Sequence, residues 1–568
     1  MVLSAAGTSL RLDANAVDYA LIAVYFVFVI GIGLLARRQV STSLDFFLSG
    51  RSLPAWVTGL AFISANLGAV EIMGMSANGA QFGMATMHYY WIGAIPAMLF
   101  LGVVMMPFYY GSKVRSVPEF MLRRFGPTAH LVNAISFAVA QVLIAGVNLY
   151  LLATIVNVLL GWPIWVSTLV AAAIVLSYIT LGGLSAAIYN EVLQFFVIVA
   201  ALLPLTLVAL NKVGGWSGLQ DKMAAAGTKG QIASWPGTDL TSISNSVLSV
   251  VGIVFGLGFV LSFGYWTTNF VEVQRAMASK NMNSARRAPI IGSFPKMFIP
   301  FIIIIPGMIA AVSVTEFAKY KANGGTGSNL TYNDALLLLM RELLPNGLLG
   351  VAIAGLLAAF MAGMAANISA FNTVISYDIW QTYVVKDRED RYYTSFGRGM
   401  TLVATLLAIA TTVLAASYNN LMTYLQTLFG FFNAPLFATF ILGMFWKKMS
   451  AAAGWTGLVS GTLAAVLVAI LSKDALGSAS IGALPVSGQG ASFVAAGAAF
   501  VVDILVSVAV TMVTRPKRES DLRGLVYSLT PKEDFADTEH AGGHWWLQPT
   551  KLAGVSLILV IILNVIFH

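Results

Sequence analysis

Long apolar runs separated by short basic loops make up most of the chain. Runs of about 20 apolar residues, enough to cross a bilayer as helices, recur from 17–36 to the C-terminus, and we count about fourteen. Lysine and arginine gather in alternate loops, for example 113–124 and 275–287, which predicts that these loops are cytoplasmic. Because Arg37 and Arg38 follow the first run, the N-terminus is expected outside.

Composition places the chain firmly in the membrane class. Of the 568 residues, 58% are hydrophobic and 10% are charged, and the mean hydropathy is +0.81. Soluble domains carry about 25% charged residues, so the pattern predicts a polytopic, all-α membrane protein. The net charge of +8 follows from the basic loops and does not indicate nucleic-acid binding. The absence of cysteine excludes disulfides, thiolate nucleophiles and cysteine-based metal sites.

Two of the apolar runs are interrupted by glycine and small polar residues. The first, LAFISANLGAVEIMGM at 60–75, contains a carboxylate, Glu71, which costs about 2.5–3.5 kcal/mol at a helix centre. The second, at 244–270, contains GLGFVLSFGYWTTN. Backbone groups freed by an unwound helix must bind protein, water or an ion. We interpret 60–75 as a helix broken around a solute or ion, and the alternative is a kinked helix in which Glu71 forms a salt bridge to Lys296.

The spacing of the two interruptions predicts an internal repeat. Paired broken helices at matching positions, here about five spans apart, are typical of inverted-repeat transporters with a binding site at the midplane. Spans two to six, 45–211, would form one repeat, and spans seven to eleven, 212–446, would form the other. A leading helix in 1–44 and C-terminal helices in 447–568 would flank them.

Other functional classes fit the sequence less well. An enzyme is not favoured, because G-x-S-x-G, P-loop and H-E-x-x-H motifs are absent and nothing indicates an organic cofactor. A channel does not require two broken helices around one site. A sensor would need a soluble signalling domain, for which the polar segment 515–548 is too short. A carrier is therefore expected, and saturable uptake would distinguish it from a channel.

Several polar residues outside the interruptions have simpler interpretations. Glu191 and Gln194, near an inner helix end, indicate either an inner gate or simple solvation. His88 is expected to be a polar helix-end residue. Acidic residues near span ends are expected to be interfacial, and a loosely spaced histidine group in the inner loop is expected to be solvated. They are Glu272, Asp378 and Asp503, and Asp537, Glu539, His540 and His544.

Four separated motifs resemble the sodium:solute symporter family, in its sodium/sugar cotransporter branch. They are FFLSGRSLPAWVTGLAFISANLGAVEIMGMSANG, RSVPEFMLRRFG, SYITLGGLSAA and GMFWKKMSAAAG, and the similarity covers about 45–457. Ile179 and the pair Ala453-Gly454 depart from the family pattern. The resemblance implies a five-plus-five inverted-repeat (LeuT-type) fold with an extra leading helix and an external C-terminus. It also implies a multi-pass plasma membrane protein, expected to be a monomer, that takes up a small polar solute by cation-coupled symport.

The resemblance also implies a solute site. Six residues match the family's sugar contacts, gate and supporting groups: Tyr89, Tyr265, Trp266, Asn269, Lys296 and Gln426. Four depart from it: Glu71 replaces glutamine, Tyr90 glutamate, Gly93 serine and Ser262 asparagine. Because a pocket matched to one hydroxyl pattern rejects others, another sugar, a polyol or another polar solute is as consistent as glucose or galactose. The aromatic run at 88–91 is equally compatible with an interfacial belt.

The coupling ion is less clearly indicated. The resemblance places sodium between backbone oxygens of Ser64 and Leu67 and, opposite them, Ala359. The family's hydroxyl ligands correspond to Ala362 and Gly363, which have no side-chain oxygen. Two hypotheses follow. Either sodium still binds a depleted or rearranged site, or Glu71 carries a proton or transport is uncoupled.

Overall fold

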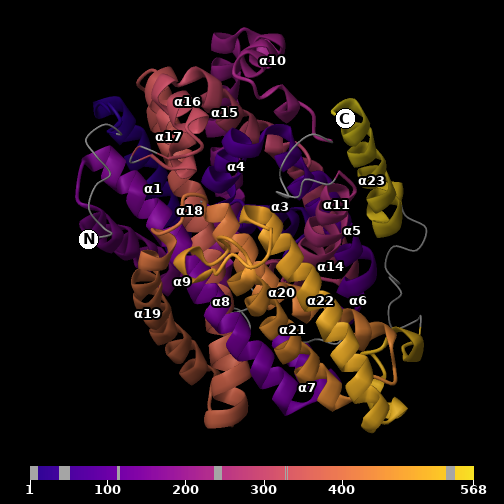
Figure 1. The fold of residues 1–568 in the computed structure, drawn as a ribbon. Helices are drawn as coiled ribbons and strands as arrows, with labels where there is room; N and C mark the ends of the chain where they lie inside the picture. Colours follow the sequence, from indigo (N-terminus) through magenta and orange to yellow (C-terminus); the bar gives the residue numbers. More distant parts are fainter. Residues whose placement is uncertain are drawn as a thin grey trace.

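The computed structural model consists of helices and connecting loops. Among the described residues the only β-type contact is an isolated bridge between Leu53 and Ser279. Long helices run side by side through the molecule (Figure 1), which agrees with the predicted all-α class. The structure describes residues 11–37, 52–68, 70–111, 116–235, 246–326, 328, 330–531 and 544–568.

The long helices are α1 (Ala16–Arg37), α8 (Pro127–Leu160), α9 (Ile164–Val213), α14 (Met282–Lys296), α15 (Ile299–Ser313), α18 (Leu348–Thr373), α19 (Asp390–Ala415), α20 (Leu421–Phe445), α21 (Ala451–Leu471), α22 (Gly488–Val513) and α23 (Pro549–Ile566). Shorter helices complete them: α3 (Ala55–Asn66), α4 (Met75–Phe82), α5 (Ile95–Phe100), α6 (Met106–Gly111), α7 (Val117–Phe125), α10 (Gly215–Ala225), α11 (Ser246–Val251), α12 (Phe263–Thr268), α13 (Phe270–Met277), α16 (Thr315–Ala322) and α17 (Ala335–Leu343).

The number of membrane spans stays a prediction. Among the described residues, 11 helices are long and apolar enough to cross a membrane, or 12 if one bent pair is counted as a span. Two shorter apolar stretches are Ala16–Val29 and Ile164–Leu176. The second lies in α9, which is one continuous helix, although the apolar runs at about 163–181 and 192–210 predict two separate spans. No proline lies between Pro163 and Pro204 to stop this helix. The predicted division into two repeats, 45–211 and 212–446, also stays a prediction.

The first predicted helix break is present. Helix α3 ends at Asn66, and the chain continues through a π-helical segment, Val70–Gly74, into α4 at an angle of 58°. At the break the Gly68 N–H donates to the Asn66 carbonyl over 2.7 Å. This short turn replaces the helical bond that Gly68 would otherwise make to Ser64, four residues earlier. The carbonyl of Ser64 is therefore released from the helix.

The second break lies at the end of the predicted interruption. The glycine-rich part is a π-helical segment, Gly252–Ser262, that continues directly into α12. The chain changes direction at Asn269, whose side chain accepts a bond from the Val271 N–H over 3.1 Å and so starts α13. The glycines thus widen the helix, and the asparagine ends it.

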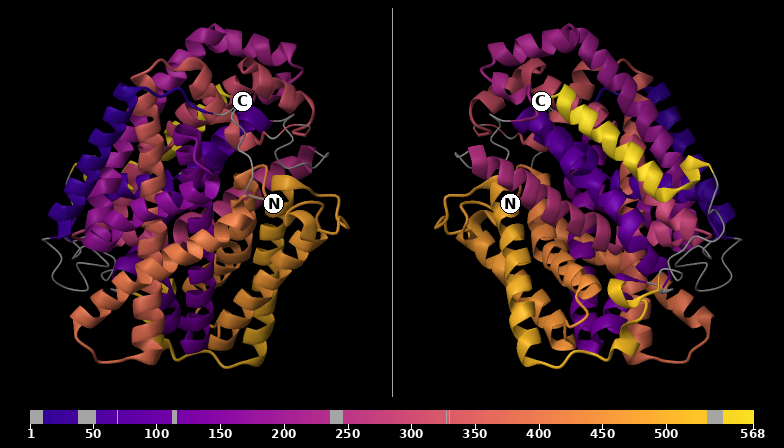
Figure 2. Two further views of the ribbon diagram at one scale, coloured as in Figure 1. Left: turned by 90° about the vertical axis from the view of Figure 1, so that its left-hand side faces the viewer. Right: turned by 90° about the vertical axis from the view of Figure 1, so that its right-hand side faces the viewer.

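Both segments of the first broken helix pack against the pair α14 and α15. Helix α3 lies along α14, and α4 lies along α15. A Cβ atom at Gly307 of α15 would overlap the carbonyl oxygen of Ser76 in α4, so these two backbones are nearly in contact. Helix α18 packs between α8, α9 and α3. Figure 2 shows α23, in yellow, lying across the outer face of the molecule, where it contacts α5 and α14.

The expectation that three acidic residues are interfacial is wrong. Glu272, Asp378 and Asp503 are all buried, because hydroxyl groups from other parts of the fold hydrogen-bond to each carboxylate. His88 is also buried and contacts the Ser234 carbonyl over 2.6 Å. Asp537, Glu539 and His540, from the predicted solvated histidine group, lie outside the described residues.

Candidate solute and ion site

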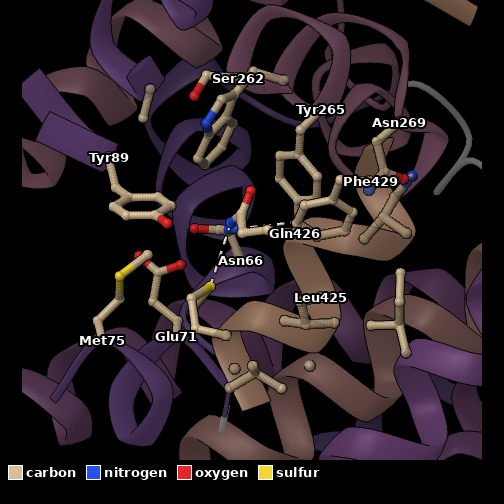
Figure 3. Close-up of a pocket in the computed structure, with 18 of the residues that line it drawn as sticks. Asn66, Glu71, Met75, Tyr89, Ser262, Tyr265, Asn269, Leu425, Gln426 and Phe429 are labelled. Carbon is tan, nitrogen blue, oxygen red and sulfur yellow. Dashed lines mark hydrogen bonds between the residues drawn. The ribbon is translucent and has the colours of Figure 1, made fainter. Parts of the chain in front are cut away.

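A cavity lies between the two helix breaks. The cavity has a volume of about 90 Å³, which is enough for several water molecules. The lining comes from α3, α8, α12, α14, α18, α20 and the π-helical segments (Figure 3). The structure brings together all nine residues predicted for the solute site: Glu71, Tyr89, Tyr90, Ser262, Tyr265, Trp266, Asn269, Lys296 and Gln426.

Aromatic rings form much of the cavity wall. Figure 3 shows Tyr89 and Tyr265 on opposite sides of its centre. The Tyr265 ring lies 5.3 Å from Trp266 and 4.6 Å from Phe429, measured between centroids. Tyr90 also lines the cavity and is buried. By sequence alone, the aromatic run at 88–91 is compatible with an interfacial belt or with the wall of a site. Its two tyrosines form part of the wall of the cavity.

A buried ion pair lies at the end of the cavity formed by the first break. Lys296 Nζ donates to Glu71 Oε1 over 2.7 Å, and these side chains are 1% and 10% exposed. The ammonium group also donates to Asn66 Oδ1 and lies 5.0 Å from the centroid of the Tyr90 ring. Among the alternatives for Glu71, the salt bridge to Lys296 is the arrangement present. The positive charge of Lys296 is thus balanced within the site.

The hydroxyl group of Tyr265 connects the two breaks. It accepts a hydrogen bond from Asn66 Nδ2 over 3.0 Å and donates one to Glu272 Oε1 over 2.6 Å. Asn66 ends α3, and Glu272 lies in the first turn of α13. Separating these two elements would require at least one of the two bonds to break.

A second buried ion pair supports α13. Arg275 Nη2 donates to Glu191 Oε1 over 2.6 Å, and both side chains are fully buried. Of the alternatives for Glu191, simple solvation is therefore wrong. Gln194, one turn further along α9, is buried and donates to the Tyr25 hydroxyl over 3.3 Å.

Two departures from the family pattern, Gly93 and Ser262, complement each other, and two residues that match it, Gln426 and Asn269, line the cavity. Ser262 Oγ occupies the space beside Gly93, where any side chain at position 93 would overlap it. Among the described residues, Gln426 Nε2 contacts the sulfur of Met422, at 3.3 Å, so its amide has remaining capacity for a solute. Asn269 lines the cavity while it caps α13.

The predicted ion residues lie on the two elements that meet at the first break. Ser64 and Leu67 are buried in and just after α3, and Ser64 Oγ has no hydrogen-bond partner among the described residues. Ala359, Ala362 and Gly363 are buried in α18. Gly363 lies against Gly68 and lines the cavity, whereas the other four do not line it.

Sequence reasoning missed three carboxamides that line the cavity as potential ligands, namely Asn66, Asn148 and Asn367. We used Asn66 only as a mark of the helix break. Asn148 lies within a largely apolar run, 131–160, and is 3% exposed in the structure. The cost of a polar group at membrane depth is the signal that could have identified it.

Comparisons with known proteins agree with this architecture. The family model for the sodium:solute symporter family matches residues 46–461. The sodium/glucose cotransporter of Vibrio parahaemolyticus is 28% identical over 473 residues, which cover 80% of this chain and 85% of that protein. Sodium/glucose cotransporter 1 of Ovis aries is 29% identical over 555 residues, which cover 92% and 83%.

A solved structure confirms the fold class. The substrate-bound, outward-open structure of a Na+-coupled sialic acid symporter superposes with a TM-score of 0.71 at 17% identity, over 89% of this chain and 99% of that one. The fold is thus that of the five-plus-five transporters that the helix breaks predicted. On the extent of the family match and on this fold, the chain is a member of the sodium:solute symporter family.

Proposed function

We propose that this multi-pass protein of the plasma membrane is a sodium-coupled symporter that brings a small, uncharged, sugar-like solute into the cell. Family membership and two relatives named as sodium/glucose cotransporters support sodium coupling and the solute class. The carrying observation is the cavity between two helix breaks, lined by aromatic faces and carboxamides around a neutralised ion pair.

The ion pair supports an uncharged solute. An anionic solute would be attracted to Lys296, but Glu71 lies 2.7 Å away and would repel it. A cationic solute would meet the opposite conflict. Hydroxyl groups instead need amide and aromatic partners, which Gln426, Asn269 and Tyr89 can supply. We therefore assign solute contacts to these residues and charge balance to Glu71 and Lys296.

Alternating access would use the bonds of Tyr265. The Tyr265 hydroxyl joins Asn66 to Glu272, and the basic loop that follows α13 predicts that this side faces the cytoplasm. Breaking either bond would separate Asn66 from Glu272 and release the cavity inward. Binding energy from solute and ion would offset that loss only when both are present, which is how a symporter couples them.

A second candidate, proton coupling through Glu71, rests on the absence of side-chain oxygen at Ala362 and Gly363. The geometry favours it less. Protonating Glu71 would remove the charge that balances Lys296 in a site where the ammonium is 1% exposed. Sodium at the carbonyls released near Ser64 carries no such penalty.

Thermal stabilisation of the purified protein tests the proposed function. A ligand of the folded state raises the apparent melting temperature by mass action. We expect neutral sugars or polyols to stabilise the protein in sodium and weakly in potassium, and sugar acids to have no effect. Gln426→Ala should raise the solute concentration needed for stabilisation about tenfold, whereas Gln220→Ala, in α10 and outside the cavity, should leave it unchanged. Equal stabilisation in both salts with a strong dependence on pH would favour the proton alternative.

A further inference from the structure

We infer that Asn148 supplies the sodium ligand that Ala362 and Gly363 lack. The inference rests on the proposed sodium coupling and identifies a residue of that site. Asn148 lies on α8, an element that neither the helix breaks nor the matched positions in the family indicated. The assignment follows from an unpaired oxygen, its position, and the other oxygens around it.

The carboxamide of Asn148 is buried with its acceptor unused. Its Nδ2 donates to the Ile144 carbonyl over 3.3 Å, so the amide is held by its own helix. Its Oδ1 has no hydrogen-bond partner among the described residues, although the side chain is 3% exposed and lines the cavity. A buried acceptor without a hydrogen bond destabilises the fold, because it loses its contact with water and gains nothing in return. Such a group indicates a ligand that the protein alone does not provide.

The position of this oxygen matches the missing one. Asn148 Oδ1 lies 3.0 Å from where a Cβ atom at Gly363 would be, and 3.1 Å from where one at Gly68 would be. It therefore fills the space that a serine side chain at position 363 would occupy. The glycines at 68 and 363 are needed for this approach, because a side chain at either would push the amide away. One oxygen donor has replaced another from a neighbouring helix.

Further oxygens lie near the end of α3, at the first break. Ser64 Oγ is buried without a partner among the described residues. The Ser64 carbonyl has lost its helical donor, because the Gly68 N–H turns to Asn66. Released backbone oxygens of a broken helix are typical sodium ligands in transporters of this architecture. All of these oxygen ligands are neutral, so the bound sodium would keep its positive charge. That charge would complement the partial negative charge of the carbonyls at the end of α3.

A solute hydroxyl is the competing occupant of Asn148 Oδ1, and the two can be separated by experiment. Sodium-dependent thermal stabilisation of the purified full chain is measured without solute, with potassium keeping the ionic strength constant. We expect Asn148→Ala to raise the sodium concentration for half-maximal stabilisation at least tenfold. Gln141→Ala is the matched control. Gln141 is a buried carboxamide of the same helix that does not line the cavity, and its Oε1 has no hydrogen-bond partner among the described residues. It should leave the sodium response unchanged.

Two further variants keep the assignment testable if Asn148→Ala folds poorly. Asn148→Asp adds a charged oxygen and should lower the half-maximal sodium concentration. Adding Gly363→Ser to Asn148→Ala returns an oxygen to the vacated space and should restore much of the response. A sodium response unchanged by Asn148→Ala or Asn148→Asp would overturn the assignment while leaving sodium coupling intact. Loss of the solute response alone would assign Asn148 to the solute, and no response in the wild type would refute both proposals.

Discussion

Removing both partners of the Glu71–Lys296 pair should destabilise the protein less than removing one. The two side chains are 2.7 Å apart and are 10% and 1% exposed. Taking one partner from a buried pair leaves an uncompensated charge, which costs about 3–5 kcal/mol, whereas replacing both with uncharged groups is often nearly neutral. We therefore expect the double variant to have nearly the same free energy of unfolding as the wild type, and each single variant to have a much lower one.

The structure also predicts which single change is worse. Glu71→Gln leaves the ammonium of Lys296 charged and only 1% exposed, with Asn66 as an acceptor. Lys296→Met leaves the carboxylate of Glu71 beside a cavity with room for water. We expect losses of about 5 kcal/mol for Glu71→Gln and about 3 kcal/mol for Lys296→Met, which are the two ends of the range for breaking a buried pair.

The assay is the free energy of unfolding in mixed detergent micelles for a complete double-mutant cycle. The coupling energy, which is the loss in the double variant minus the two single losses, should be about −8 kcal/mol, far outside the roughly 0.5 kcal/mol scatter of independent sites. Glu316→Gln provides a control at a more exposed pair, in which Glu316 is 39% and Arg341 23% exposed, and it should cost less than about 1 kcal/mol. A double variant whose loss equals the sum of the single losses would refute the reasoning.

Three further changes test other parts of the structure. Gln426→Ala should raise the solute concentration for half-maximal uptake about tenfold, the value of one or two lost hydrogen bonds, with unchanged protein in the membrane; uptake kinetics decide this, and unchanged kinetics would remove Gln426 from the site. Gly307→Ala should force α15 away from Ser76 and lower the melting temperature, while an unaltered temperature would contradict the close packing. Arg275→Gln should leave the carboxylate of Glu191 buried and alone, costing about 3–5 kcal/mol, and Arg275→Gln with Glu191→Gln should recover most of that loss in the same unfolding assay.

Much of the site could be predicted because its signals are local in sequence. A glycine and small polar residues within an apolar run mark a broken helix wherever they occur, and 60–75 behaves in this way. The family resemblance then indicated nine solute residues, and these meet in one cavity. In the second run the break lies at Asn269, the last residue of the predicted interruption, and not at its glycines, because glycines can widen a helix without unwinding it.

The acidic residues show where local signals end. Glu272 and Asp503 lie near span ends in sequence, which favoured exposure, yet both are buried. The Tyr265 hydroxyl donates a hydrogen bond to Glu272, and the Thr439 hydroxyl, on another helix, donates one to Asp503. A carboxylate stays buried when packing supplies donors, and the sequence pattern does not contain the packing.

The sequence by itself determined the class of the protein, the placement of its apolar helices, the first helix break and most of the residues around the cavity. Each of these depends on the solvation of a continuous stretch of chain by lipid, which composition and order express directly. Only the tertiary structure decided that Lys296 balances Glu71, 225 residues away, and that Asn148 fills the space beside Gly363. Such contacts depend on how closely separate helices approach, and sub-ångström differences in packing decide whether an oxygen meets a charge, an ion or nothing.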